Sequence, residues 1–489
     1  MLFRQTWHFI FLTDTALYFS NKYGILFFVS RPCNPDDLDF EQRTIRLFSY
    51  VQSETVREML QEESEENVVQ NAMFKRNLNL EDRLNCRIEV YERVGDTNSN
   101  FITDEITNLI NGGFDTYNIM TTAGYRMCAM AKLGHFSNLL DLPFINTEKD
   151  YYSQGYNDAL SVGNAQYLLT GQFSLSYYRY MIGMFFNKNL FTKAGVEYPY
   201  QTVLNGDWDF HEVAELSANF YIDLNGQGDV NVDDQFGYVM WVGPASSLTD
   251  GYMASAGLRV VGKDGENLYV SDLSSTADFS NAIDNILKMM YSDGSYTSST
   301  YFDVVGKFTA GTAALTSFRL FFLEETGMMN LGNTGQGYGI LPLPKSDSET
   351  QDKYYSYIQD QCLLYAIPRT VEGAKRVESS QFLEAYASES YQTVKSAYYE
   401  RALTSRYAKD PESVQMLEIM ESSTFFDPAN IYIGTAFKAF GTTQLRDMYA
   451  SGTNTIGSLL QGKRDLIVEE AIKLNQTFQE LWKSSEEAR

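Results

Sequence analysis

The sequence predicts an α/β protein with two or more lobes, and three observations predict this class. Strand-like and helix-like segments alternate from Thr44 to Thr121, and a second alternation begins near Ile182. The chain has 489 residues, which is long for a single hydrophobic core. Hydrophobic residues make up 44% of it and charged residues 21%, so we expect a packed protein rather than a disordered acidic tail.

The first unit has the order β-α-β-α-β. Alternating apolar residues predict strands at 44–50, 87–92 and 117–121, and helical spacing predicts helices at 67–85 and 103–111. This order favours a parallel sheet, in which ligands gather at the carboxyl ends of the strands. The carboxyl ends of the first and third strands carry Ser49, Tyr50, Thr121 and Thr122.

The second unit begins with predicted strands at 182–186 and 236–242. Between them, Asp209 and Glu212 form the D-x-x-E pattern of a capping box, which predicts the start of a helix. An apolar stripe from Phe279 to Met290 predicts another helix, and a stripe from Ile467 to Leu481 predicts a C-terminal one.

Composition and motifs argue against several classes of function. The net charge of -25 repels phosphate backbones, so we expect no nucleic-acid partner. The three histidines are far apart in sequence, and the four cysteines show no C-x-x-C pair, so a zinc enzyme is not expected. Residues 457–463 resemble a phosphate-binding loop, but Arg464 replaces the required Ser or Thr. The sequence gives no support for an enzyme and none for a required cofactor.

One loop has the spacing of a calcium site. The oxygen-bearing residues follow the calcium-loop order, with Gly226 at the position of the sharp turn: Asp223, Asn225, Gln227, Asp229, Asn231 and Asp234. Gln227 replaces an anionic ligand, and Asp234 is shorter than the usual Glu. The pattern therefore leaves two interpretations open, a structural calcium ion or a turn rich in Asn, Gly and Asp.

Aromatic residues are numerous, at 14% of the chain, and many lie near predicted strand ends or in loops. Flat rings with polar tips suit a ligand that has both C–H and hydroxyl surfaces, as sugars have. On this basis Phe318 and Arg319 join the candidate binding residues.

The N-terminus allows two interpretations. Arg4 precedes apolar runs at 7–18 and 24–29, and Cys33 follows, which is the order of an export signal with a lipid-carrying cysteine. However, Arg31 and Pro32 occupy positions where small residues precede cleavage. Residues 1–40 are therefore either a degraded signal or an ordinary extension, and neither run is long enough to span a bilayer.

Four segments together resemble one family. They are FFNKNLFTKAG at 185–195, NGDWDF at 205–210, the Asp223 loop ending in DDQFG at 237, and GILPLPK at 339–345. In order and spacing they are similar to extracellular solute-binding protein family 1, the carbohydrate-binding lipoproteins of bacterial ABC importers. The resemblance runs from about Thr44 to the C-terminus.

The resemblance implies a two-lobe periplasmic-binding-protein-like fold of type II, with the ligand in a cleft between the lobes. The implied lobes are 41–171 plus 358–400 and 172–357 plus 401–489. The implied ligand-binding residues are Ser49, Tyr50, Thr122 and Tyr125 from the first lobe, Tyr178, Arg179 and Tyr180 from a hinge, Trp241 and Tyr252 from the second lobe, and Tyr432 from the C-terminal part.

We therefore expect a monomeric, non-enzymatic receptor outside the cytoplasm, anchored at the cell surface. It would bind a carbohydrate, most simply an oligosaccharide, and deliver it to an ABC transporter permease. The alternative is a glycosidase or lyase acting on polysaccharide, which would need two carboxylates facing the cleft. A peptide or cation receptor on the same fold would instead place unpaired acidic groups there.

Overall fold

The computed structural model describes residues 38–51, 57–59, 61–95, 100–142, 144–243, 246, 248–265, 267–270, 276–333, 337–399, 410–432 and 444–487, together with the backbone of 15–19 and 26–30. The last two segments form an antiparallel hairpin of β1 (Thr15–Phe19) and β2 (Leu26–Ser30). Cys33 and most of the predicted N-terminal extension or export signal lie outside the described residues.

The first lobe is built on a four-stranded sheet with the order β13-β5-β3-β4. Its strands are β3 (Thr44–Val51), β4 (Arg87–Val94), β5 (Ile119–Ala123) and β13 (Leu363–Ala366). The pairs β3–β4 and β3–β5 are parallel, which confirms the predicted parallel arrangement, and β13 is antiparallel to β5. The chain therefore returns to this sheet after it has built the second one.

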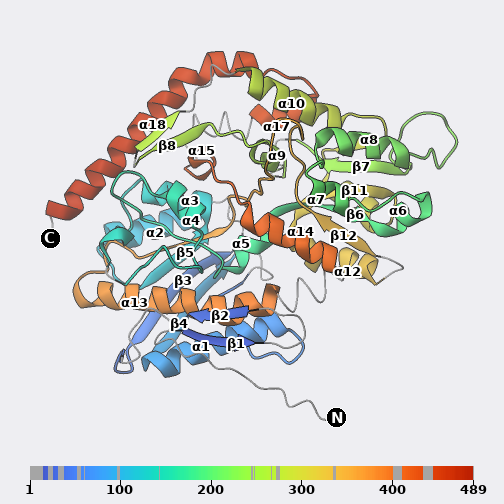
Figure 1. The fold of residues 1–489 in the computed structure, drawn as a ribbon. Helices are drawn as coiled ribbons and strands as arrows, with labels where there is room; N and C mark the ends of the chain where they lie inside the picture. Colours follow the sequence, from blue (N-terminus) through green and yellow to red (C-terminus); the bar gives the residue numbers. More distant parts are fainter. Residues whose placement is uncertain are drawn as a thin grey trace, which may run out of the picture.

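Helices surround this sheet (Figure 1). They are α1 (Val68–Leu84), α2 (Phe101–Asn111), α3 (Gly124–Ala131), the short 3-10 turn Leu139–Asp141, α4 (Gln154–Leu160) and α13 (Gly373–Ser390), which continues as the π-helical segment Tyr391–Lys395. Local signals explain the limits of α1. The Asn67 side chain accepts hydrogen bonds from the backbone N–H groups of Val69 and Gln70, and Asn85 ends the helix in the left-handed conformation at φ 47°.

The second lobe is built on a five-stranded sheet with the order β10-β7-β11-β6-β12. Its strands are β6 (Ile182–Asn187), β7 (Phe236–Trp241), β10 (Ser295–Ser298), β11 (Ala313–Arg319) and β12 (Tyr338–Leu341). Strand β7 is parallel to β10 and β11, whereas β6 is antiparallel to β11 and β12.

The helices of the second lobe are mostly short. They are α6 (Lys188–Ala194), α7 (Tyr200–Asn205), α8 (Phe210–Phe220), α9 (Asp250–Ser255), α10 (Thr276–Met290), α11 (Tyr301–Thr309), the 3-10 turn η3 (Leu320–Glu324), α12 (Thr326–Gly332), α14 (Pro411–Ser422) and α17 (Gln444–Ser451). The predicted cap of α8 is confirmed, because the Asp209 side chain accepts a hydrogen bond of 2.9 Å from the Glu212 backbone N–H.

Two segments connect the sheets side by side. Residues 180–182 follow α5 (Leu175–Arg179) and lie antiparallel to residues 357–359. The Ile182 N–H donates to the Tyr357 carbonyl at 2.9 Å, and the Gln359 N–H donates to the Tyr180 carbonyl at 3.0 Å. These segments lie where the hinge was expected. The exact lobe boundaries given above stay a prediction.

A second connection runs along one side of the molecule. It consists of the hairpin β8 (Val261–Asp264) and β9 (Asn267–Val270), the short helix α15 (Pro428–Ile431) and the 32-residue helix α18 (Ile456–Glu487). Residues 457–463 lie inside α18, so their likeness to a phosphate-binding loop is accidental. Among the helices that the structure describes, none is both long and apolar enough to cross a membrane.

Candidate ligand-binding site

The carboxyl edge of the second-lobe sheet carries a cluster of aromatic rings. Strand β7 ends at Trp241 and β11 ends at Arg319, one residue after Phe318. Trp241 meets Tyr301 edge to face at a centroid distance of 5.5 Å, and Tyr301 meets Phe318 in the same way at 5.6 Å. The indole N–H of Trp241 donates to the Ser299 carbonyl at 3.1 Å, which fixes the orientation of the ring.

The start of α11 extends this cluster into solvent. The Tyr301 hydroxyl donates to a carboxylate oxygen of Glu325 at 2.6 Å. Phe302 is 78% exposed, more than any other large apolar side chain in the described part of the chain. A large exposed apolar ring beside half-buried aromatic residues is typical of a binding surface. Trp241, Tyr301 and Phe302 are therefore the residues of this edge that are best placed to stack on a ligand.

Arg319 joins this edge to the segment between the lobes. Its Nη1 donates to the side-chain oxygens of Gln359 at 3.2 Å and Gln361 at 3.1 Å. Its guanidinium also lies over the ring of Tyr180, 5.4 Å from the centroid. Burial of Tyr180 raises the pKa of its hydroxyl to about 12, so this group stays protonated at neutral pH. Positive charge and neutral hydrogen-bonding groups thus meet between the two sheets.

The carboxyl edge of the first-lobe sheet is less exposed. The Thr122 hydroxyl donates to the Tyr50 carbonyl at 3.0 Å, and the Tyr125 N–H donates to the Asp360 carbonyl at 3.1 Å. Tyr125 itself is half-buried beneath the guanidinium of Arg126, 5.2 Å from its ring centroid. Tyr125 is therefore the predicted residue of this edge that is most accessible.

Ser49 points away from the cleft edge. It is in register with Thr121 on β5, and Thr121 is in register with Tyr365 on β13. Paired residues of neighbouring strands share a face of the sheet, and Tyr365 packs against Tyr386 of α13 at 6.1 Å. The Ser49 side chain therefore lies on the face that α13 covers, beside Glu92, which is in register with it on β4.

Helix α5 is held at both ends by carboxylates from different lobes. At its N-terminal end, Glu58 accepts hydrogen bonds from the Leu175 N–H at 2.6 Å and the Ser174 hydroxyl at 2.9 Å. At its C-terminal end, Arg179 donates two hydrogen bonds to Glu324, of 2.8 and 3.0 Å. Burial raises the pKa of Glu58, whereas these hydrogen bonds lower it. The ion pair of Arg179 and Glu324 thus joins the end of α5, next to the crossing segments, to the second lobe.

A third buried pair lies close to the crossing segments. Asp250, at the start of α9, binds Arg446 of α17 through both carboxylate oxygens. Burial raises the pKa of Asp250 to about 7, although the guanidinium opposes this shift. Because Arg446 occupies both oxygens, this carboxylate is not free to act on a ligand.

The structure brings together only some of the predicted ligand-binding residues. Trp241, Phe318 and Arg319 line one small pocket, together with Tyr301 and Glu325. Tyr252 and Tyr432 lie elsewhere and are buried, at 0% and 1% exposure. The Tyr252 hydroxyl meets that of Tyr238, and the Tyr432 hydroxyl donates to the Leu160 carbonyl.

The other predicted residues are also mostly buried. Tyr50 is 6% exposed, and the Tyr178 hydroxyl donates to Glu421 at 2.9 Å. The ligand role of every predicted residue stays a prediction. Sequence reasoning missed Tyr301 and Phe302, although Ser298-Ser299-Thr300 before them is the kind of strand-to-helix turn where binding residues gather.

The oxygens of the Asp223 loop are turned toward its own backbone. Asp223 accepts from the N–H groups of Gly226 at 2.6 Å and Gly228 at 2.8 Å, and Asn225 accepts from Gln227 at 2.9 Å. Asp234 accepts from the Tyr221 hydroxyl at 3.1 Å. The structure describes no group of three or more His, Cys, Asp or Glu residues arranged to hold a metal ion. Calcium binding by this loop stays a prediction.

The sequence matches no protein-family model and no curated protein. Among solved structures, the fold is similar to a sugar transporter from Rhizobium etli in an open conformation, with a TM-score of 0.55, 14% identity and coverage of 88% of this chain and 99% of the other. It is also similar to the galacto-N-biose/lacto-N-biose I-binding protein of the Bifidobacterium longum ABC transporter, with a TM-score of 0.53, 12% identity and coverage of 86% and 98%.

A third similar structure is the GacH receptor of Streptomyces glaucescens, which was solved without ligand and with acarbose. The TM-score is 0.52 at 14% identity, over 90% of this chain and 99% of the receptor. These matches confirm the predicted α/β fold with two lobes, which is the fold of ABC-transporter sugar-binding proteins.

Proposed function

We propose that the chain is a carbohydrate receptor that works outside the cytoplasm and delivers its ligand to an ABC transporter permease. The observation that carries this proposal is the aromatic cluster of Trp241, Tyr301 and Phe302 at the carboxyl edge of the second sheet. Ligands of open α/β sheets gather at such edges, and sugars present C–H faces that stack on aromatic rings. The fold shared with sugar-binding proteins supports the same assignment.

The structure offers little support for the alternative, a glycosidase or lyase. Such an enzyme needs two carboxylates that are free to exchange protons or attack the sugar. Three acidic residues near the lobe junction already have strong partners: Glu58 binds the start of α5, Glu324 binds Arg179, and Asp250 binds Arg446. We therefore propose a binding function without catalysis, in a protein that acts as a monomer.

Thermal-shift screening against mono- and oligosaccharides tests this proposal. A ligand at 100 times its Kd adds about 2.7 kcal/mol to the free energy of unfolding, so a bound sugar raises the melting temperature measurably. A sugar that touches both lobes also favours the closed form, so small-angle scattering with that sugar should give a smaller radius of gyration. If no sugar in a broad panel changes the melting temperature or the radius, the carbohydrate assignment is wrong.

Incubating each bound sugar with the protein separates the receptor from the alternative. A receptor leaves the sugar intact, whereas a glycosidase or lyase releases products that chromatography detects. The appearance of such products, with a rate proportional to protein concentration, would replace the proposal with the enzymatic one.

A further inference from the structure

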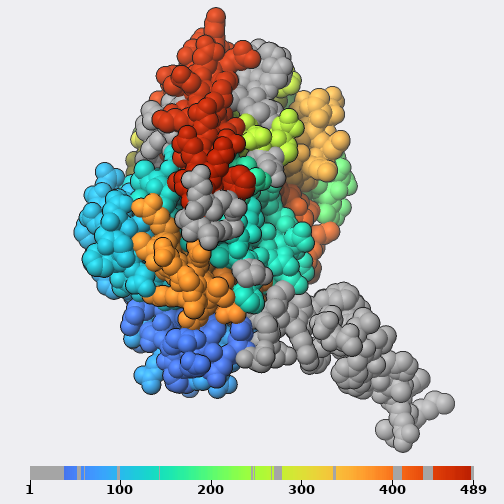
Figure 2. All heavy atoms as spheres, turned by 90° about the vertical axis from the view of Figure 1, so that its left-hand side faces the viewer, coloured from blue at the N-terminus to red at the C-terminus, as the bar shows by residue number. Residues whose placement is uncertain are grey.

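A second cavity lies apart from the aromatic edge. It has a volume of about 560 Å³ and lies between the first lobe and the last turns of α18. Ligand pockets in proteins usually measure about 300–1,000 Å³, so the cavity can hold a small molecule. Figure 2 shows α18 running along this side of the protein, with its lower end near α13. Phe136, Leu142 and Leu481 supply apolar lining.

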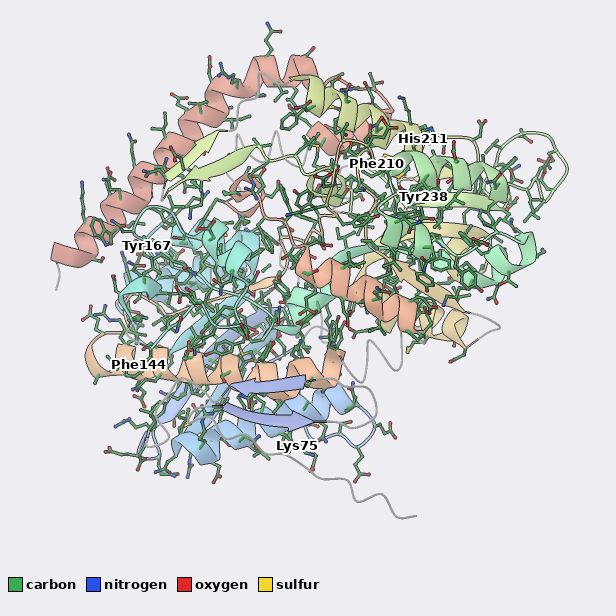
Figure 3. The ribbon with its side chains drawn as sticks, in the orientation of Figure 1. Lys75, Phe144, Tyr167, Phe210, His211 and Tyr238 are labelled. Carbon is green, nitrogen blue, oxygen red and sulfur yellow. The ribbon has the colours of Figure 1, made fainter. Side chains whose placement is uncertain are left out.

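Tyr167 lines this cavity with an unsatisfied hydroxyl. Its side chain is 3% exposed, and its hydroxyl has no hydrogen-bond partner within the described structure. Its ring packs edge to face against Phe478 of α18 at a centroid distance of 5.2 Å. Figure 3 shows the position of Tyr167 in the first lobe. A buried hydroxyl without a partner is costly, and in native proteins it usually indicates a bound group or water.

Two arginines line the same cavity without partners. The guanidinium groups of Arg369 and Arg376 form no hydrogen bond or ion pair with any residue that the structure describes. By contrast, the buried Arg179 and Arg446 each bind a carboxylate through two nitrogens. Arg369 is exposed and Arg376 is half-buried, so both guanidinium groups are accessible to a ligand in the cavity. Their planar groups match the geometry of a carboxylate or phosphate.

The N-terminus of α13 adds a third positive feature. Glu372 and Gly373 belong to the cavity lining, and α13 begins at Gly373 and runs for 18 residues. The Glu372 side chain does not cap the helix, so the cap leaves the first backbone N–H groups available. A helix N-terminus with available N–H groups favours an anion.

Two carboxylates limit what the cavity accepts. Asp141 and Glu372 belong to its lining, so the formal charge of the lining is balanced. The lining therefore gives a polyanion no net attraction, whereas a single compact anionic group can lie between the two arginines. The apolar lining then suits the remainder of a small organic molecule.

We propose that this cavity binds a small organic anion through one carboxylate or phosphate group. Arg369, Arg376 and the first N–H groups of α13 hold the anionic group, and the Tyr167 hydroxyl donates a hydrogen bond to the ligand. The site is separate from the aromatic edge and does not depend on the function proposed above.

Isothermal titration calorimetry with inorganic phosphate and D-glucuronate tests the site, at constant ionic strength in chloride buffer. D-Glucose serves as the neutral probe of similar shape. The double variant Arg369→Gln/Arg376→Gln should raise the Kd of the binding anion about tenfold to a hundredfold, because charge-assisted hydrogen bonds are lost. The matched control Arg87→Gln/Arg464→Gln removes two exposed arginines elsewhere and should leave this Kd unchanged.

Tyr167→Phe provides a second, conservative test. It keeps the ring against Phe478 and removes only the hydroxyl, so the Kd should rise about tenfold while the fold is preserved. If phosphate and glucuronate each bind, the site recognises an anionic group of either kind. If only one of them binds, the result shows whether the site takes a phosphate or a carboxylate. If neither probe binds at millimolar concentration, or if the cavity variants bind as tightly as the wild type, the proposal is wrong. Glucose binding that the cavity variants also weaken would equally contradict it.

Discussion

Replacing Glu324 with Gln should destabilise the protein strongly, because it strands a buried charge in the hinge. The Arg179 and Glu324 side chains are only 8% and 17% exposed, and their two hydrogen bonds measure 2.8 and 3.0 Å. At about 3 Å and an effective dielectric constant of about 20, the attraction between the charges is about 5.5 kcal/mol. Removing one partner of a buried pair typically costs about 3–5 kcal/mol, and we expect a loss in that range.

Arg179→Met should cost less than Glu324→Gln. The carboxylate that remains is the more exposed partner, and it still accepts a hydrogen bond of 3.2 Å from Tyr398. The double variant Arg179→Met/Glu324→Gln should be more stable than Glu324→Gln alone, because it removes the guanidinium that the single variant leaves without its carboxylate partner. Urea unfolding followed by far-ultraviolet circular dichroism at pH 7 measures each change as a shift of the midpoint.

The matched control is the exposed pair of Arg46 and Glu89, which has a similar distance of 2.9 Å. Its side chains are 47% and 61% exposed, so Glu89→Gln should cost less than about 1 kcal/mol. If Glu324→Gln costs no more than Glu89→Gln, burial does not make the hinge pair important. If the double variant is less stable than both single variants, the cost does not come from a stranded charge.

Three further predictions follow from the same structure. Trp241→Ala should raise the Kd of a sugar found in the screen about tenfold to a hundredfold in calorimetry, because stacking area is lost. The control Phe114→Ala removes a ring that is 59% exposed on the first lobe and should leave this Kd unchanged. Equal affinities for wild type and Trp241→Ala would remove Trp241 from the site. Burial raises the pKa of Asp427 from 3.8 to about 6, so its contribution to the free energy of unfolding is greatest below pH 4 and falls by about 3 kcal/mol as pH rises through 6. Asp427→Asn should lack this fall. If the urea midpoints of both proteins change in parallel from pH 4 to 7, the pKa of Asp427 is not raised. If the Asp223 loop binds calcium, a chelator should lower the melting temperature of the wild type but not that of Asp223→Ala. Identical melting temperatures of the wild type with and without chelator would show that the loop is a structural turn without calcium.

Elements whose limits depend on local signals could be predicted from the sequence. The helix expected at 67–85 is observed at Val68–Leu84, because both ends carry Asn residues whose capping geometry is local. The strand expected at 44–50 is observed at Thr44–Val51, where an apolar run supplies a central strand. In contrast, the short strand β10 (Ser295–Ser298) has a polar sequence that no pattern indicates, and it forms because β7 offers it an edge.

The candidate site was harder to predict, because the accessibility of a side chain depends on contacts between distant segments. Tyr252 and Phe302 are both aromatic residues that follow a strand of the second sheet, Tyr252 after β7 and Phe302 after β10, yet one is fully buried and the other is 78% exposed. The difference arises from the partners that pack on them. Tyr252 contacts Tyr238 of β7 and Phe210 of α8. Among the described residues, the aromatic partner recorded for Phe302 is its chain neighbour Tyr301, which it meets edge to face.

Helix α18 shows the same limit on a larger scale. Its apolar stripe predicts that the helix packs on something, but it does not identify the surface. At about 1.5 Å per residue its 32 residues extend about 48 Å, which is enough to reach both lobes. It packs on α10 of the second lobe, while Phe478 and Leu481 reach the first lobe, where a Cβ atom at Gly134 would lie 2.5 Å from Leu481. Any change in the angle between the lobes must therefore shift one end of α18, bend it or detach it, so this helix and the hinge together restrict how the cleft opens.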